Sequence, residues 1–324
     1  MSAKGVDLRS IQQAEARIRP HIDVTPARRI GEGRVWLKCE NRQRTGSFKI
    51  RGALNKVLGL STNELGRGIV AASAGNHGQG VALAASLRRA QATIVVPKGA
   101  VQVKVDRIRE LGAEVVFASG DYAAAEAEGL ALARRRGATW VSPYNDPEVI
   151  AGQGTIALEL AGQLDLAGPS EWEVFVPVSG GGLLGGIAIG LKALAPQVRV
   201  VGVQPEAAPY MHTFFNLGDL GNVVEMPTIA DGLSGAVEAG SITFALVREA
   251  VDEIVLVSEE AIWEAIRWAD RQAGEVIEPS AATALAACLL GEERKGIAVL
   301  SGGNIDPRVL EQARAGEGRH VDAR

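Results

Sequence analysis

The chain has 324 residues, of which 47% are hydrophobic and 22% are charged, and its net charge at pH 7 is −4. This balance is typical of a soluble globular protein and lacks the basic footprint of a nucleic-acid-binding protein. The N-terminal residues lack the positive-then-apolar pattern of a secretion signal, and no apolar run approaches the ~18 residues of a membrane span. The two cysteines, Cys39 and Cys288, lie far apart. We therefore expect a cytoplasmic protein without a membrane or nucleic-acid partner.

Short strand patterns alternate with longer helical patterns along nearly the whole chain. The predicted strands cover residues 35–39, 69–73, 93–96, 114–117, 139–142, 172–178, 199–203, 253–257 and 297–300. The predicted helices include residues 81–89, 103–111, 122–136, 156–164 and 261–271. This alternation predicts an α/β fold of βαβ units, in which helices cover parallel sheets.

The four predicted strands between residues 69 and 142 recur roughly every 22–24 residues, which predicts one compact four-stranded unit. The flanking strands then form a second, larger sheet. We predict a small inserted α/β domain over residues 53–145 and a discontinuous large domain over residues 1–52 and 146–324. Ligands of such folds bind beyond the carboxyl ends of the strands.

Lys49 stands near the start of a predicted helix, after Ser47, a good N-cap residue. The positive end of the helix dipole disfavours an ammonium there, and Phe48 and Ile50 make the surroundings apolar. We therefore expect a lowered pKa for Lys49, and a neutral amine can form a Schiff base with a carbonyl cofactor. Taken alone, this window fits a solvated surface lysine better.

The segment 73–80 follows a predicted strand and carries Ser73, Asn76 and His77 among glycines. A strand-to-helix turn of this kind exposes backbone N–H groups beside hydroxyl, amide and imidazole groups, which suits a carboxylate. No second histidine stands at metal-ligand spacing, so the sequence predicts no histidine-based metal site here.

A glycine-rich loop at residues 179–183 follows another predicted strand, and consecutive glycines before a helix form an anion cradle. Gly180, Gly182 and Gly185 also match the dinucleotide pattern G-x-G-x-x-G. That alternative expects an acidic residue at the end of the next strand, where Gln204 stands. We therefore favour a single phosphate, although such glycines can also serve only close helix–strand packing.

Two further turns carry polar groups. Glu278 precedes Pro279 at the start of a predicted helix, and Ser301 follows the last predicted strand. A hydroxyl at a strand end can hydrogen-bond a ring nitrogen without carrying charge. Singly, each turn fits ordinary turn chemistry.

In combination, these segments resemble the fold type II pyridoxal-phosphate enzymes, and more narrowly the threonine/serine dehydratase branch that includes serine racemase. The resemblance covers about residues 8 to 312. It implies an α/β fold of two parallel-sheet domains with flanking helices, like that of the tryptophan synthase β chain. The segments that carry it are the lysine motif at 44–53 and the stretches 73–80, 151–155, 179–183, 228–232 and 301–304.

The resemblance also implies roles for individual residues. Lys49 would be the Schiff-base lysine and the base that removes the Cα proton. The implied cofactor-binding residues are Phe48, Lys49, Asn76, Ser179, Gly180, Gly181, Gly182, Leu183, Glu278 and Ser301, and the implied substrate-binding residues are Ser73, Asn76 and His77. The implied reaction is β-elimination from L-threonine and/or L-serine, which gives a 2-oxo acid and ammonia. We also expect a homo-oligomer, either a dimer or a tetramer.

Departures from the family pattern guide the choice within it. Racemases of this kind carry a serine where Ala74 stands, and an alanine cannot transfer a proton, so dehydratase is favoured over serine racemase. Gln204 and Tyr210 replace carboxylates expected of the family's cation site, so we predict no metal. Hydroxyaspartate dehydratase and, from another class, a nicotinamide-dependent oxidoreductase stay as alternatives.

Overall fold

The computed structural model describes residues 5–168, 171–291 and 295–316. Its helices are α1 (Leu8–Ile18), α2 (Lys49–Leu58), α3 (Thr62–Gly66), α4 (Asn76–Leu87), α5 (Gln102–Glu110), α6 (Tyr122–Arg136), α7 (Pro147–Gln163), α8 (Gly182–Leu194), α9 (Tyr210–Leu217), α10 (Thr243–Ala250), α11 (Glu259–Trp268), α12 (Pro279–Leu290) and α13 (Pro307–Ala315). Short helical turns are η1 (Arg19–His21), η2 (Glu40–Arg42), η3 (Asp231–Leu233) and the π-helical η4 (Ala269–Ala273). The strands are β1 (Ala27–Arg29), β2 (Val35–Lys38), β3 (Ile69–Ala72), β4 (Ala92–Val96), β5 (Glu114–Phe117), β6 (Thr139–Trp140), β7 (Trp172–Pro177), β8 (Arg199–Pro205), β9 (Glu253–Val257) and β10 (Lys295–Val299).

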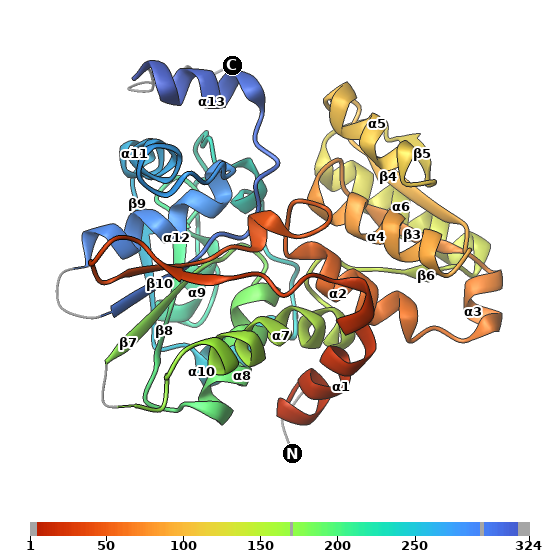
Figure 1. Cartoon of the computed structure of the whole chain (residues 1–324). Helices are drawn as coiled ribbons and strands as arrows, with labels where there is room; N and C mark the ends of the chain where they lie inside the picture. The colour runs from red at the N-terminus through yellow and green to blue at the C-terminus, as the bar shows by residue number, and fades with distance from the viewer. Residues whose placement is uncertain (1–4, 169–170, 292–294, 317–324) are drawn as a thin grey trace.

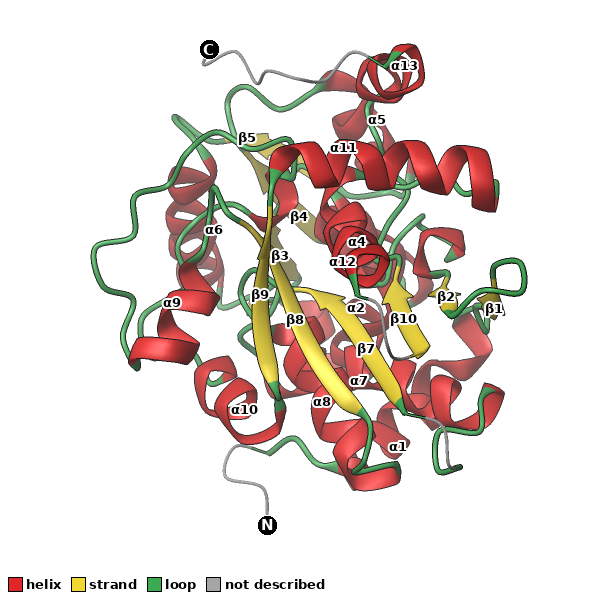
Figure 2. Cartoon of the chain, turned by 90° about the vertical axis from the view of Figure 1, so that its left-hand side faces the viewer, coloured by secondary structure: helices red, strands yellow, loops and turns green. Residues whose placement is uncertain are grey.

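The larger sheet has six strands in the order β1-β2-β10-β7-β8-β9. Strand β1 pairs antiparallel with β2, and the other neighbours are parallel. Figure 2 shows β9, β8, β7 and β10 side by side. Both faces are buried, since Val174 and Val176 pack with the cluster of α7, α8 and α10 whereas Phe175 joins the cluster of α11 and α12.

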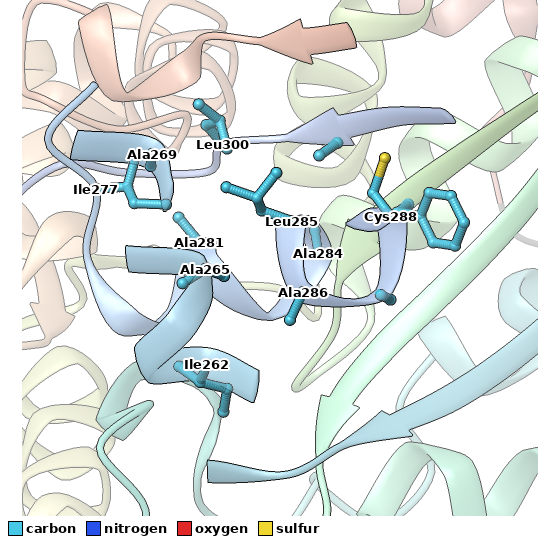
Figure 3. Close-up of a cluster of buried hydrophobic side chains, with 14 of the residues drawn as sticks. Ile262, Ala265, Ala269, Ile277, Ala281, Ala284, Leu285, Ala286, Cys288 and Leu300 are labelled. Atoms are coloured by element: carbon cyan, nitrogen blue, oxygen red, sulfur yellow. The ribbon is translucent and has the colours of Figure 1, made fainter. Parts of the chain in front are cut away.

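Small side chains let α11 and α12 lie close to each other and to the sheet. Figure 3 shows the alanines of both helices gathered with Leu285, Cys288 and Leu300. The labelled residues Ile262, Ala265, Ala269, Ile277, Ala281, Ala284, Leu285, Ala286, Cys288 and Leu300 are all buried. This core fixes the start of α12 against the end of β10, where two of the predicted site residues stand.

The smaller sheet has four parallel strands in the order β5-β4-β3-β6. Ile69 and Ala71 of β3 belong to the cluster that contains the apolar side of α2, and Val70 and Ala72 to the cluster of α6. Figure 1 shows this sheet and its helices on one side of the molecule and the six-stranded sheet on the other, with α2 and α7 between them. Helix α2 therefore lies where the two layered units meet.

The predicted α/β fold with two mainly parallel sheets is confirmed, and all nine predicted strands are present within two residues at either end. The antiparallel edge strand β1 was not predicted. The domain boundaries stay a prediction. Among the described helices, none is both long and apolar enough to cross a membrane.

Two predicted helix starts were wrong: α7 begins at residue 147 rather than 156, and α4 begins at residue 76 rather than 81. Glycines in the early turns look like helix breakers, but here they are required by close neighbours. A Cβ on Gly154 would lie 2.8 Å from the carbonyl oxygen of Gly186, and one on Gly80 would lie 3.2 Å from the backbone of Lys49. Tertiary packing thus overrides the helix propensity of glycine.

Candidate active site

Loops that follow four parallel strands, β3, β6, β7 and β10, meet at one place. Lys49 Nζ donates a hydrogen bond to the carbonyl oxygen of Pro143, after β6, at 2.9 Å. Asn76 Nδ2, after β3, donates to Glu278 Oε1 at 2.7 Å. The ring of Tyr144 packs against Gly180, after β7. The site therefore lies beyond the carboxyl ends of the strands, as predicted.

Lys49 is the first residue of α2, but the predicted N-cap at Ser47 is wrong. Phe48 occupies the cap position with helical dihedral angles, and Ser47 Oγ is buried without a hydrogen-bond partner in the structure. The reason is pairing with the segment after β10, because Ser47 forms an antiparallel bridge with Gly302 and the Phe48 N–H donates to the Ser301 carbonyl at 3.0 Å. This pairing places Lys49 beside Ser301.

The predicted lowering of the Lys49 pKa is confirmed. Burial disfavours the ammonium and lowers the pKa of Lys49 to about 8, although the Glu278 carboxylate acts in the opposite direction. The ammonium lies 5.2 Å from the centroid of the Phe48 ring. Its hydrogen-bond acceptor at Pro143 carries no net charge, so the neutral amine is accessible near physiological pH.

The glycine loop ends in an uncapped helix start. Gly181 is the N-cap residue of α8 with φ +85°, and no side chain caps the helix. The first N–H groups of a helix lack intrahelical partners, so those of α8 are free to bind an anion. A Cβ on Gly181 would lie 2.9 Å from side-chain atoms of Met211 and Thr243. Residues 180–183 are buried, and Ser179 is half-buried.

The loop of residues 73–76 also ends in an uncapped helix start, at α4. Its residues are half-buried, and the Gly75 N–H donates to Ser73 Oγ at 3.0 Å. The amide of Asn76 is held on both sides, because Asn304 Nδ2 donates to its Oδ1 at 2.7 Å while its own Nδ2 donates to Glu278. One Nδ2 hydrogen of Asn76 is left for a ligand.

His77 is buried, and its Nε2 lies 2.9 Å from the carbonyl oxygen of Val141. That contact requires an Nε2–H donor, so Nδ1 is an acceptor. Burial and the charge of Lys49 lower the pKa of His77 to about 3, although the bond to Val141 raises it. The imidazole is therefore neutral and has no second N–H to offer an anion.

Glu278 and Ser301 complete the predicted set. Burial raises the pKa of Glu278 to about 7, against the hydrogen bond from Asn76, which lowers it. Ser301 is buried at the end of the β10 segment. The structure thus brings Lys49, Asn76, Glu278 and Ser301 together by direct contacts or shared neighbours.

Three contributors were missed by sequence reasoning: Pro143, Tyr144 and Asn304. The Tyr144 hydroxyl accepts a hydrogen bond from the Glu238 N–H at 2.9 Å, which fixes the ring over the glycine loop. Their only sequence signal is position, since each follows a strand's carboxyl end. Within the described ranges, no group of three or more His, Cys, Asp or Glu side chains is placed to hold a metal ion.

Comparison with known proteins agrees with this geometry. The chain is 45% identical to an L-threonine ammonia-lyase of Thermotoga maritima over 283 residues, 86% of this chain and 69% of that protein. Among solved structures, the T.th. threonine deaminase superposes with a TM-score of 0.85 at 39% identity, covering 93% of this chain and 99% of that one. Maize serine racemase gives a TM-score of 0.88 at 32% identity, covering 96% and 98%. Residues 18–302 match the family described as pyridoxal-phosphate dependent enzymes, and the chain belongs to that family.

Proposed function

We propose that this protein is an ammonia-lyase that converts L-threonine and/or L-serine to a 2-oxo acid and ammonia by β-elimination. The observation that carries the proposal is Lys49, a lysine with a pKa of about 8 whose Nζ rests on a neutral carbonyl beside an uncapped glycine loop. The relatives named threonine ammonia-lyase and threonine deaminase support the same reaction.

The residues present fit pyridoxal phosphate. The free N–H groups of residues 179–183 at the start of α8 would hold its phosphate, and Lys49 would hold its aldehyde carbon. Phe48 would pack against the ring, Asn76 would donate its remaining Nδ2 hydrogen to the phenolic oxygen, and Ser301 would meet the ring nitrogen. Glu278 would act through Asn76, whose amide it orients. When bound, the cofactor supplies the electron sink for breaking the Cα–H and Cβ–O bonds.

Two sets of groups of this chain would act on the substrate directly, one on its Cα proton and one on its carboxylate. Lys49 Nζ, once free, accepts the Cα proton, and its lowered pKa suits that task near neutral pH. The N–H groups of Asn76 and His77 at the uncapped start of α4, together with the Ser73 hydroxyl, would bind the substrate carboxylate. His77 contributes through its backbone, because its ring nitrogens have no N–H left.

Borohydride reduction of the purified holoenzyme, followed by peptide mapping, tests this assignment. We expect the reduced label on Lys49 and on no other lysine. A substrate panel scored by release of 2-oxo acid then identifies the preferred β-hydroxy amino acid. A label on a different residue, or no 2-oxo acid from any substrate of the panel, contradicts the proposal.

Serine racemase is the second candidate, because maize serine racemase is among the similar structures. Racemisation requires a second acid or base on the opposite face of Cα, and Ala74 stands half-buried in the loop that follows β3. We predict that Ala74→Ser raises D-serine formation from L-serine by roughly tenfold, a modest general acid–base effect. Chiral product analysis measures it, with Ala74→Gly as the matched control. Rapid D-serine formation by the unaltered protein would contradict the preference for elimination.

We also propose that the protein is cytoplasmic and homo-oligomeric. Cys39 and Cys288 are both free and buried, and burial raises the pKa of each thiol to about 12, which fits a reducing compartment. Light scattering of the purified holoenzyme tests the oligomeric state, and a monomeric mass would contradict it.

A further inference from the structure

Four charged side chains are buried together behind α2. They are Lys38 of β2, Glu40 of η2, Arg51 of α2 and Glu159 of α7, and no side chain among them exceeds 4% exposure. We call them the buried ion cluster. Charged residues are rarely buried so completely unless they are paired, and this cluster lies away from the proposed reacting atoms.

Arg51 makes the most directional contacts of the cluster. Its Nε and Nη2 donate to the two carboxylate oxygens of Glu40 at 2.7 and 2.8 Å. Its Nη1 donates to Glu159 Oε1 at 2.8 Å and to Thr155 Oγ1 at 3.1 Å. A planar guanidinium held by a bidentate carboxylate on one side and by α7 on the other cannot rotate.

Lys38 completes the cluster from the opposite side. Its Nζ donates to Glu159 Oε2 at 2.5 Å and to the Thr25 carbonyl at 2.6 Å. Lys38 and Arg51 thus share Glu159, but only Arg51 belongs to the helix that carries Lys49.

Stability alone is a poor explanation for the buried ion cluster. Removing charges from water offsets most of the attraction between them, and well-packed apolar side chains often stabilise equally well. What a buried ion pair adds is a defined geometry. Arg51 is two residues after Lys49, so the two side chains leave α2 roughly 200° apart around the helix axis. Fixing the Arg51 side of the helix therefore directs Lys49 to the opposite side, toward Pro143.

Close backbone packing fixes the distance between α2 and α7. A Cβ on Gly152 of α7 would lie 2.6 Å from the Arg51 carbonyl oxygen and 2.6 Å from the Cα of Gly52. The two helices therefore touch through their backbones, which fixes their separation. Rotation of α2 about its axis is restrained one turn further on by Asn55, whose Nδ2 donates to the Glu148 carbonyl at 2.7 Å. The contacts of Arg51 add a side-chain restraint only two residues from Lys49.

We propose that Arg51, held by Glu40 and Glu159, is a positioning residue that sets the direction of the Lys49 amine. This inference rests on the proposed function of Lys49. It assigns no contact with substrate or cofactor to Arg51.

The test compares Arg51→Lys with Lys38→Met in the holoenzyme. Arg51→Lys keeps the charge but loses the planar fork, and we expect kcat to fall roughly 100-fold with KM within about threefold, as for a small misplacement of a reacting group. We also expect a shift in the pH midpoint of the absorbance band of the cofactor bound to Lys49. Lys38→Met, the matched control, should lower the melting temperature at least as much, keep kcat within about threefold and leave that midpoint unchanged.

Equal effects of the two variants on the absorbance midpoint, or no effect of Arg51→Lys beyond a lower melting temperature, would overturn the proposal. If Arg51→Lys does not fold, Glu40→Gln provides the same test, because it keeps the side-chain shape and weakens the bidentate pair. It should shift the midpoint in the same direction by a smaller amount, and an unchanged midpoint overturns the inference. Failure of the proposed function is distinguishable, since the unaltered protein would then carry no borohydride label on Lys49.

Discussion

Lys38 and Lys49 stand eleven positions apart, and burial lowers the pKa of both, but their surroundings give them different roles. Lys38 Nζ is bound to the Glu159 carboxylate, and both Glu40 and Glu159 oppose the effect of burial on its pKa. Lys49 Nζ is bound to a neutral carbonyl, with Glu278 as the opposing charge.

Burial alone therefore does not make a lysine reactive. A carboxylate at hydrogen-bond distance favours the charged ammonium and opposes the lowering of the pKa by burial, which suits a structural cation. A carbonyl accepts a hydrogen bond from either protonation state and leaves the amine free to lose its proton. Lys49 also contacts Pro143, whose neighbour Tyr144 packs against the glycine loop, whereas Lys38 contacts Thr25 and Glu159.

Replacing the reactive lysine should have the largest effect. We expect Lys49→Ala to reduce 2-oxo acid release by at least about 10³-fold, because both the attachment point and the Cα base are lost. Urea unfolding of the variant in its cofactor-free form should differ from that of the unaltered protein by less than about 1 kcal/mol, since no ion pair is broken. Substantial turnover by Lys49→Ala would contradict the assignment of Lys49 as the reactive lysine and Lys38 as the structural one.

The structural lysine should show the opposite result. Lys38→Met leaves Glu159 with one cation fewer in a buried place, and we expect a loss of about 3 kcal/mol in the free energy of unfolding. Urea denaturation measures it, and turnover below the melting temperature should stay within about threefold. A stable Lys38→Met protein would show that the buried ion cluster contributes little to folding.

The anion cradle that distinguishes Lys49 can be tested by adding one methyl group. A Cβ on Gly180 runs into the Tyr144 ring, so Gly180→Ala should weaken cofactor affinity by about 2 kcal/mol, roughly 30-fold. The control is Gly185→Ala on α8, where the nearest atom is Leu246 Cβ at 3.3 Å. Absorbance titration of the cofactor-free protein measures both. Equal cofactor affinities of the two variants would contradict the proposed role of the glycine loop in binding the cofactor phosphate.

The pH dependence of cofactor uptake should also reflect the lowered pKa of Lys49. Raising the pH removes the proton from Lys49, and with a pKa of about 8 the rate of cofactor uptake should rise about tenfold per unit below pH 8 and level off above it. Stopped-flow absorbance from pH 6 to 10 measures the rate, and a lysine-containing peptide corrects for the cofactor's own titration. A rate that continues to rise up to pH 10 would show that the pKa of Lys49 is not lowered.

Much of the fold and the chemical centre could be predicted, because they are encoded locally. β-branched runs indicate strands at any position in the chain, and Lys49 and the glycine loop are recognisable within a few residues. Helices α4 and α7 were shortened in the prediction because the use of their glycines depends on neighbours distant in sequence. The three residues of β1 carry two arginines and no alternation of their own.

The missed part of the site depends on long-range contacts. Pro143 and Asn304 meet Lys49 and Asn76 across 94 and 228 positions. The burial of Arg51 could not be predicted from the sequence either, because an arginine in a helix is exposed in most proteins. Local patterns therefore identify which groups can react, and tertiary contacts decide how they are oriented.

The glycine contacts of α7 have a consequence for how this protein can change. Gly152 of α7 packs against the backbone of α2, and Gly154 of α7 packs against the backbone of α8. Helix α7 therefore holds both the helix that carries Lys49 and the helix that begins at the anion cradle. The spacing between amine and cradle is therefore independent of the side chains that surround the substrate. Substitutions at Ser73 or Ala74 can therefore alter which amino acid is accepted, while the three helices keep the spacing between the amine and the anion cradle.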